Sequence, residues 1–204
     1  VAKLEQDMGE EFRGARLLEL FEKVAQPTLD FIRTSCKEWI PSVDAQLVVS
    51  CIELLHGYLL GADKQQDAEV FDEDPSSDSK IDPILAEFRR PEITHKNVAR
   101  EDKTLLFDMY FIMSFIWSFG GNLADNSRQA FNSFVRPLLA QIVSNYPAEE
   151  EVSVFDLCIH KASHKFITWA HIVPDFTYDR NLPYFELFVP TTETTSLKSI
   201  MTTL

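Results

Sequence analysis

Glycine is scarce in this chain, and none follows Gly121. The 204 residues include six glycines, and the pattern G-x-x-x-x-G-K-[ST] does not occur. A phosphate-binding loop needs backbone N–H groups presented in conformations that glycine adopts and bulkier residues do not. A run of four apolar residues followed by Asp-Glu, the usual place for magnesium and the attacking water in nucleotide hydrolases, is also missing. We therefore predict no catalytic residues for nucleotide hydrolysis in this sequence.

Basic residues are in the minority. Lysine and arginine number 19 against 32 aspartates and glutamates, and the net charge is −13. Binding to phosphate backbones needs clustered basic residues, so a general nucleic-acid binder is disfavoured, as is docking on an acidic membrane or on the acidic face of a microtubule. The longest apolar run, Leu105 to Phe119, contains Asp108, and its uncharged part is shorter than the roughly 20 residues of a membrane span. We expect neither a nucleic-acid nor a membrane partner.

Cysteine is also rare. Cys36, Cys51 and Cys158 are scattered and odd in number, so they do not form a disulfide framework. No Asn-x-Ser/Thr acceptor for glycosylation occurs. Both observations favour a reducing, cytoplasmic compartment.

A metal site is not indicated. Cys158, His160, His164 and His171 lie two, four and seven residues apart, which is not a zinc-finger spacing. The stretch Asp72 to Asp78 resembles a calcium loop but lacks the glycine at its sixth position and the glutamate at its twelfth. A small metalloenzyme would depend on the histidines alone, and we expect no metal.

The apolar residues are spaced for a mainly α fold of the α+β class, with four to five helices followed by a small β hairpin and a linker. We place the boundary between the helical part, residues 1–148, and the hairpin with its linker, residues 149–204. Two prolines fall inside helical patterns: Pro27 is expected to kink or restart its helix, and Pro137 to interrupt another. Four helices are expected. The first covers residues 12–39, the second runs from a cap at Ser42 to a stop at Gly61, the third covers residues 104–120, and the fourth starts from a cap at Asp125 or Asn126. Two strands are expected around residues 152–157 and 166–169.

Two features of the helical part carry specific expectations. Residues 62–103 form an expected mobile acidic loop, since Asp63 to Asp82 contains eight acidic and two basic residues, and Ile84 to Phe88 is a possible short helix within it. The helix over 104–120 is apolar nearly all round, so other elements should cover it on most sides. We therefore expect Trp117 in the core.

The end of the sequence combines aromatic residues with a turn. The segment Asp175 to Phe188 predicts an aromatic-rich strand, Pro190-Thr191 a turn, and Ser196 to Leu204 the start of a helix. The chain begins with Val1, has no signal-peptide pattern and ends within a helical pattern. We therefore expect it to be a piece of a longer polypeptide.

Four segments together resemble a dynein heavy chain, in the same order and with similar spacing. The most specific motif among them is Phe115-Ile116-Trp117-Ser118-Phe119-Gly120-Gly121-Asn122-Leu123. This motif is more similar to the axonemal than to the cytoplasmic branch of the family. The acidic loop carries little of the match. The four segments are Leu20 to Pro41, Val43 to Leu55, Phe115 to Phe134, and Val154 to Thr194.

This resemblance implies the helical lid of the second AAA+ module, followed by the connection into the third, in a ring of six modules of a microtubule motor. The segment itself would need no cofactor, whereas the parent ring would hold ATP or ADP and magnesium. Implied partners are the neighbouring modules, microtubules, and dynein intermediate and light chains. The implied location is the cytoskeleton, in the axoneme of a cilium or flagellum.

The resemblance also implies residues near nucleotide. Val189, Pro190, Thr191 and Thr194 match the entry to a module, although Thr195-Ser196 stands where the family usually continues with Val-Arg. By alignment with the lid of the first module, Tyr110 occupies the position of an arginine that a lid often points at the nucleotide. A neutral tyrosine there cannot neutralise phosphate charge. The apolar helix around Tyr110 favours the alternative, in which it is simply a core aromatic residue.

Two hypotheses remain open from the sequence. The first is a non-catalytic structural segment that closes over one module's nucleotide and transmits its state to the next. The alternative is a free-standing helical adaptor whose apolar groove binds a partner helix.

Overall fold

The structure of the chain is a computed structural model. It describes residues 10–66, 100–147, 152–160, 163–176, 183 and 189–204. Most of the expected acidic loop, the possible helix at 84–88, the calcium-like stretch and most of the expected aromatic strand lie outside these residues. At the edges of the acidic loop, residues 62–66 and 100–103 are helical, so the loop is shorter than expected.

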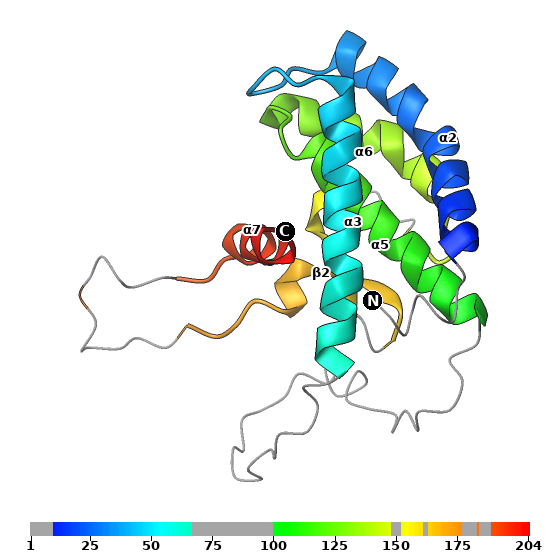
Figure 1. Ribbon diagram of the computed structural model, residues 1–204. Helices are drawn as coiled ribbons and strands as arrows, with labels where there is room; N and C mark the ends of the chain where they lie inside the picture. Colours follow the sequence, from blue (N-terminus) through cyan, green and yellow to red (C-terminus); the bar gives the residue numbers. More distant parts are fainter. Residues whose placement is uncertain (1–9, 67–99, 148–151, 161–162, 177–182, 184–188) are drawn as a thin grey trace.

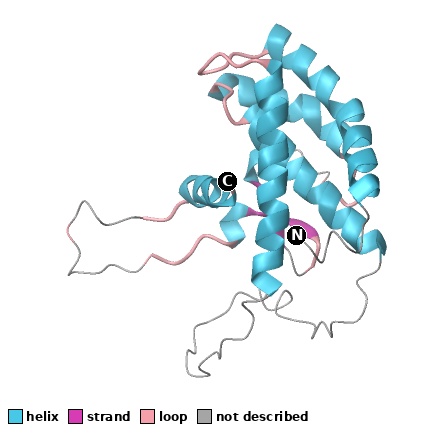
Figure 2. Cartoon of the chain, viewed as in Figure 1, coloured by secondary structure: helices cyan, strands magenta, loops and turns pink. Residues whose placement is uncertain are grey.

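The described residues form a helical bundle with a small hairpin, which confirms the mainly α fold (Figures 1 and 2). The most extensive interface joins α3 to α5, and α2 packs on α6. The helices are α2 (Glu10–Ser35), α3 (Asp44–Gln66), α5 (Arg100–Gly120), α6 (Asp125–Leu139) and α7 (Thr192–Thr203), with short 3-10 helices η1 (Val154–Asp156) and η2 (Trp169–His171). Strands β1 (Leu157–His160) and β2 (Lys165–Thr168) pair antiparallel, with Leu157 opposite Thr168.

Helix α2 passes through Pro27 without the restart that the sequence predicted. Pro27 is exposed, so the carbonyl group that loses its N–H partner to the proline ring lies on the solvent side of the helix. Val24 and Leu29, on either side, are 1% and 7% exposed and fix both halves of the helix to the core. Burial on the opposite face therefore keeps α2 continuous.

Three other helix ends differ from expectation. Helix α3 continues past the expected stop at Gly61 to Gln66. At its other end, the Ser42 hydroxyl donates to the Glu38 carboxylate instead of capping α3. Helix α6 follows Ala124, which makes no side-chain cap, with Asp125 in its first turn. Pro137 does not interrupt α6 but lies within its last turn.

The hairpin begins later than the sequence predicted. Residues Val154–Asp156 form η1, because the Ser153 hydroxyl accepts a hydrogen bond from the Phe155 N–H and the Asp156 carboxylate accepts one from the Ser153 N–H. This local capping turns the chain before β1 can start at Leu157.

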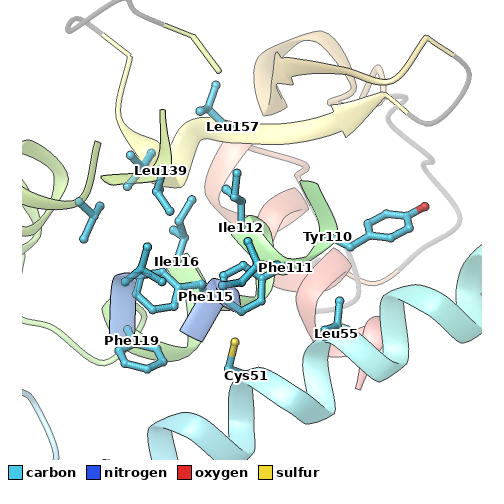
Figure 3. Close-up of a cluster of buried hydrophobic side chains, with 14 of the residues drawn as sticks. Cys51, Leu55, Tyr110, Phe111, Ile112, Phe115, Ile116, Phe119, Leu139 and Leu157 are labelled. Atoms are coloured by element: carbon cyan, nitrogen blue, oxygen red, sulfur yellow. The ribbon is translucent and has the colours of Figure 1, made fainter. Parts of the chain in front are cut away.

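The core is aromatic and centred on α5 (Figure 3). Phe115 is fully buried and stacks on Phe111 and Phe119, with ring centroids 5.9 and 4.3 Å away. By contrast, Trp117 is only partly buried: it lies at the edge of the core and meets Phe155 edge to face at 5.8 Å. The expectation that Trp117 lies in the core was wrong, because its direction on α5 points toward η1 rather than toward α3.

A buried ion pair joins α2 to α5. Arg16 Nε donates to Asp108 Oδ1 at 3.0 Å, and a second guanidinium nitrogen donates to Oδ2 at 2.5 Å. The Asp108 side chain is 6% exposed and that of Arg16 is 19% exposed. Asp108 is the charged residue within the long apolar run of the sequence. Its carboxylate thus finds its hydrogen-bond donor on α2, more than ninety residues earlier in the chain.

Helix α7 docks on the bundle at a glycine. A Cβ atom added to Gly57 of α3 would lie 1.8 Å from the backbone oxygen of Thr203, near the end of α7. Helix α7 also contacts η2, and Ser196 is buried on its inner face. The absence of a side chain at Gly57 therefore sets how closely α7 approaches α3.

We expect Gly57→Ala to loosen α7, because the new methyl group would overlap the Thr203 carbonyl and the helix would have to shift. Gly61→Ala, one turn later, meets nothing within 4 Å and should stabilise α3 by up to about 1 kcal/mol. Hydrogen exchange of the α7 amides checks this: exchange should be faster in Gly57→Ala than in Gly61→Ala. Equal rates in the two variants would contradict the docking described here.

Candidate functional site

A hollow lies beneath α7, between α3, α5, β1 and η2. We call it the Tyr110 pocket. Its volume is about 440 Å³, within the size range of small-molecule sites. It is lined by Gly57, Tyr58, Gly61, Tyr110, Met113, Cys158, Ile159, Trp169, Ile172, Ser199, Thr202 and Thr203.

Tyr110 belongs to the wall of this pocket, and its hydroxyl group is enclosed by the protein. The residue is 1% exposed, yet its hydroxyl has no hydrogen-bond partner. Its ring stacks on that of Tyr58, with centroids 5.4 Å apart and planes 9° from parallel. Figure 3 shows the ring directed away from Phe111 and Phe115, between α3 and the hairpin. Burial raises the pKa of Tyr110 to about 12, so the hydroxyl is neutral at physiological pH.

No charged side chain is among the residues that line the Tyr110 pocket. Cys158 contributes a thiol whose pKa is raised to about 12 by burial. A thiol with so high a pKa is a poor nucleophile at neutral pH. The pocket can therefore accommodate apolar and hydrogen-bonding groups, whereas its lining offers no counter-charge to phosphate.

The other predicted site residues lie at the opposite end of α7. Thr191 and Thr194 cap its N-terminus reciprocally: the Thr194 N–H donates to Thr191 Oγ1 at 3.2 Å, and the Thr191 N–H donates to Thr194 Oγ1 at 2.8 Å. Val189 is 55% exposed and Pro190 is partly buried. This confirms a helix near the end of the chain, although α7 begins four residues before the expected Ser196.

The structure thus does not bring the five predicted residues into one site. Tyr110 faces the C-terminal part of α7, where Ser199, Thr202 and Thr203 line its pocket. Thr191 instead lines a separate hollow with Thr168 and Glu193. Tyr110 and Thr191 therefore line different hollows.

Two of the three histidines that suggested a metal have side-chain hydrogen-bond partners of their own. His160 Nδ1 lies 2.7 Å from the Ser163 hydroxyl, and His171 Nδ1 lies 2.7 Å from the Thr168 hydroxyl. Within the described ranges, no group of three histidine, cysteine or acidic side chains could hold a metal ion. In the same part of the chain, no helix combines the length and apolar character that a membrane crossing requires.

Sequence reasoning missed several residues of the Tyr110 pocket. The sequence predicted Gly61 as the end of its helix and placed Trp169 in a strand. A signal was present in α3, where Gly57 and Gly61 are four residues apart and so share one face of the helix. Small residues at that spacing allow another backbone to approach closely.

The bundle, its attached hairpin and the docked α7 define a helical structural module. A family model described as "Dynein heavy chain AAA lid domain" matches the chain over residues 17–85 and 79–171, a range that ends before α7. The chain therefore belongs to the dynein heavy chain AAA lid domain family.

Several curated dynein heavy chains are similar to this chain. Dynein axonemal heavy chain 6 of Homo sapiens is 29% identical over 180 residues, covering 87% of this chain and 4% of the relative. The dynein alpha chain of the flagellar outer arm of Chlamydomonas reinhardtii is 24% identical, covering 89% and 3%. The ciliary dynein beta chain of Heliocidaris crassispina is 25% identical, covering 92% and 3%. The chain thus spans only a few per cent of the length of these relatives.

Proposed function

We propose that this chain forms the lid of the second AAA+ module of an axonemal dynein heavy chain, together with the connection into the third. The family match and the ciliary and flagellar names of the relatives support this assignment. They give no support to a free-standing adaptor. The parent would be a microtubule motor of the axoneme that holds ATP or ADP and magnesium in its ring.

The observation that carries the proposal is the docking of α7 on α3 at Gly57. In this assignment α7 opens the third module, while α3 belongs to the lid of the second. A lid that contacts the next module through packed backbone can transmit its position as a rigid body. The neighbouring modules of the same chain are therefore the direct partners, and microtubules and intermediate and light chains are partners of the whole motor.

Nucleotide contact is assigned to the N-terminal end of α7. Val189, Pro190, Thr191 and Thr194 would border the nucleotide of the third module. Tyr110 would stand in place of the lid arginine of the second module, so the lid supplies no cation at this position. Because cations near the phosphates support hydrolysis, the second module should hold its nucleotide as a structural ligand.

We expect the purified 204-residue chain to show no ATP turnover above a buffer blank, because it lacks a phosphate loop and the magnesium carboxylates. The measurement is phosphate release, with the intact heavy chain as the positive control. Turnover that persists at constant specific activity through repeated purification would contradict the assignment of a structural lid.

A second experiment addresses Tyr110 in the intact heavy chain. The ring is incubated with ATP, freed of unbound nucleotide and denatured, and the nucleotide released from the second module is identified. To isolate that module, the phosphate loops of the other nucleotide-binding modules are inactivated. We expect to recover ATP after prolonged incubation, because a module with a tyrosine at this position should hydrolyse ATP slowly or not at all. Recovery of ADP would contradict this expectation.

A further inference from the structure

An exposed apolar loop joins α2 to α3. Trp39, Ile40 and Val43 are 67%, 70% and 59% exposed, and Pro41 between them is exposed as well. We call residues 39–43 the Trp39 loop. Consecutive exposed apolar residues are unusual on a protein surface unless they serve an interaction. Tryptophan in particular is enriched among the residues that contribute most to binding between protein surfaces.

The Trp39 loop is fixed to the bundle through its main chain. The Trp39 N–H donates to the Asn122 carbonyl at 2.9 Å, and the Ile40 N–H donates to Asn122 Oδ1 at 3.2 Å. The Asn122 side-chain amide donates back to the Ile40 carbonyl at 2.5 Å, and an isolated bridge pairs Glu38 with Leu123 beside these bonds. None of these bonds uses the side chains of Trp39 or Ile40. A fixed backbone therefore presents both side chains to solvent, which lowers the entropy lost when a partner binds them.

The Trp39 loop is separate from the docking site of α7. Figure 1 shows the loop at the end of the bundle where α2 meets α3, away from α7. Helix α7 docks at Gly57, which is about 20 Å along α3 from its first residue, Asp44, at about 1.5 Å per residue. A partner on the Trp39 loop would thus make a second contact, independent of α7.

The charged residues that flank the loop along the chain balance one another. Arg33 pairs with Glu38 at 2.7 Å and with Asp44 at 2.8 Å, and Lys37 supplies a second positive charge. The loop therefore presents apolar surface without a strong field of either sign. An uncharged apolar pocket complements such a surface better than a strongly acidic or basic one does.

The size of the loop favours a partner within the same polypeptide. The exposed parts of its side chains amount to roughly a few hundred Å², which is less than the about 800 Å² per partner in a stable complex of separate proteins. A second copy of the chain would therefore bind weakly through it. Two surfaces of one polypeptide meet at an effective concentration on the order of millimolar, so a small apolar contact can stay closed. The curated relatives offer such surfaces, because this chain covers only 4% and 3% of two of them.

We propose that the Trp39 loop inserts Trp39 and Ile40 into an uncharged apolar pocket on another folded domain of the same heavy chain. This inference rests on the proposed function, because it needs the heavy chain around the lid. The lid would then be attached to the motor at two separate places, the Trp39 loop and α7. Two such attachments restrict rotation of the bundle, which a single contact would allow.

Photo-cross-linking of the intact heavy chain tests this contact. A benzophenone amino acid replaces Ile40, the motor is irradiated, and the linked peptides are identified by mass spectrometry. We expect a link to apolar residues of the same heavy chain that lie outside these 204 residues. A link only to a second heavy chain or to another protein, or the absence of any link, would overturn the proposal.

Leu18 on α2 is the matched control position for the probe. It is a large aliphatic residue that is 61% exposed, and among the described side chains of α2 no other large apolar one is exposed. The same probe at Leu18 should give little product. An equal yield at Leu18 and Ile40 would show that the probe reacts at any exposed position, and would also overturn the proposal.

A charge placed in the loop tests the apolar character of the contact. Trp39→Glu should lower the yield from the probe at Ile40, because a carboxylate loses hydration in an uncharged pocket. Gln26→Glu creates the same residue at an exposed position of α2 and should leave the yield unchanged. The bonds of the loop come from main-chain groups, so Trp39→Glu preserves them. An unchanged yield in Trp39→Glu would overturn the proposal.

A probe at Met201 separates this inference from the proposed function. Met201 on α7 is 74% exposed and should link to the third module if α7 opens that module. A link from Met201 to the third module, with none from Ile40, would refute the contact of the Trp39 loop and leave the proposed function standing. Failure of Met201 to link to the third module would instead count against the proposed function, while the result at Ile40 would still decide the contact of the loop.

Discussion

Replacing Arg16 with methionine should lower the free energy of unfolding by about 3 kcal/mol, because it leaves the carboxylate of Asp108 buried without its partner. The side chain of Asp108 is only 6% exposed. Urea unfolding near neutral pH provides the measurement. Lys23→Met is the control: Lys23 pairs on the surface with Glu19, which is also the second partner of Arg16, and such surface pairs contribute about 0.2–1 kcal/mol.

The combined change Arg16→Met with Asp108→Leu should recover most of the lost stability, because two apolar side chains replace an ion pair without leaving a buried charge. If the double variant is no more stable than Arg16→Met alone, the loss comes from packing rather than from the unpaired carboxylate.

The loss in Arg16→Met should also depend on pH. Burial raises the pKa of Asp108 above its ordinary value, and the bonds from Arg16 oppose that rise. Without Arg16 the folded-state pKa rises further above the unfolded-state value, so the folded protein holds the proton more tightly. The variant therefore loses stability as pH rises through this raised pKa, and its deficit relative to the parent should shrink under mildly acidic conditions. A deficit independent of pH would argue against a charged Asp108.

Phe115→Ala should cost about 3–5 kcal/mol of unfolding free energy, because it removes a fully buried ring and leaves a cavity. Phe115 is 0% exposed and stacks on two other rings of α5. Thermal and chemical unfolding of the purified variant measure the loss.

Trp117→Ala, two residues later on the same helix, is the contrast. Trp117 is only partly buried and makes its main aromatic contact with Phe155, so surrounding water can fill part of the vacated space. We expect a clearly smaller loss than for Phe115→Ala. A larger loss at Trp117 than at Phe115 would show that the centre of the core lies beside η1 rather than between α3 and α5.

Several properties of this protein were determined by the sequence alone. The period of apolar residues predicted the bundle, including a helix that ends at residue 120, because this signal acts within a few residues of the chain. The lack of a phosphate loop is likewise visible in the sequence, since such a loop is contiguous. The resemblance to dynein heavy chains also depended on the order of short segments, and the family match agrees with it.

Other properties were decided only by tertiary packing. Local propensity predicted a restart of the helix at Pro27 and a stop at Gly61, and neither occurs. At Pro27, the buried side chains of Val24 and Leu29 fix both halves of α2 to the core. The hydrogen bond lost to the proline costs little free energy there, because the free carbonyl group faces water. The direction of Trp117, the partner of Asp108 and the separation of Tyr110 from Thr191 depend on which helix faces lie together. Those pairings join residues distant in the chain, and a one-dimensional pattern does not specify them because each apolar face could pack against several others.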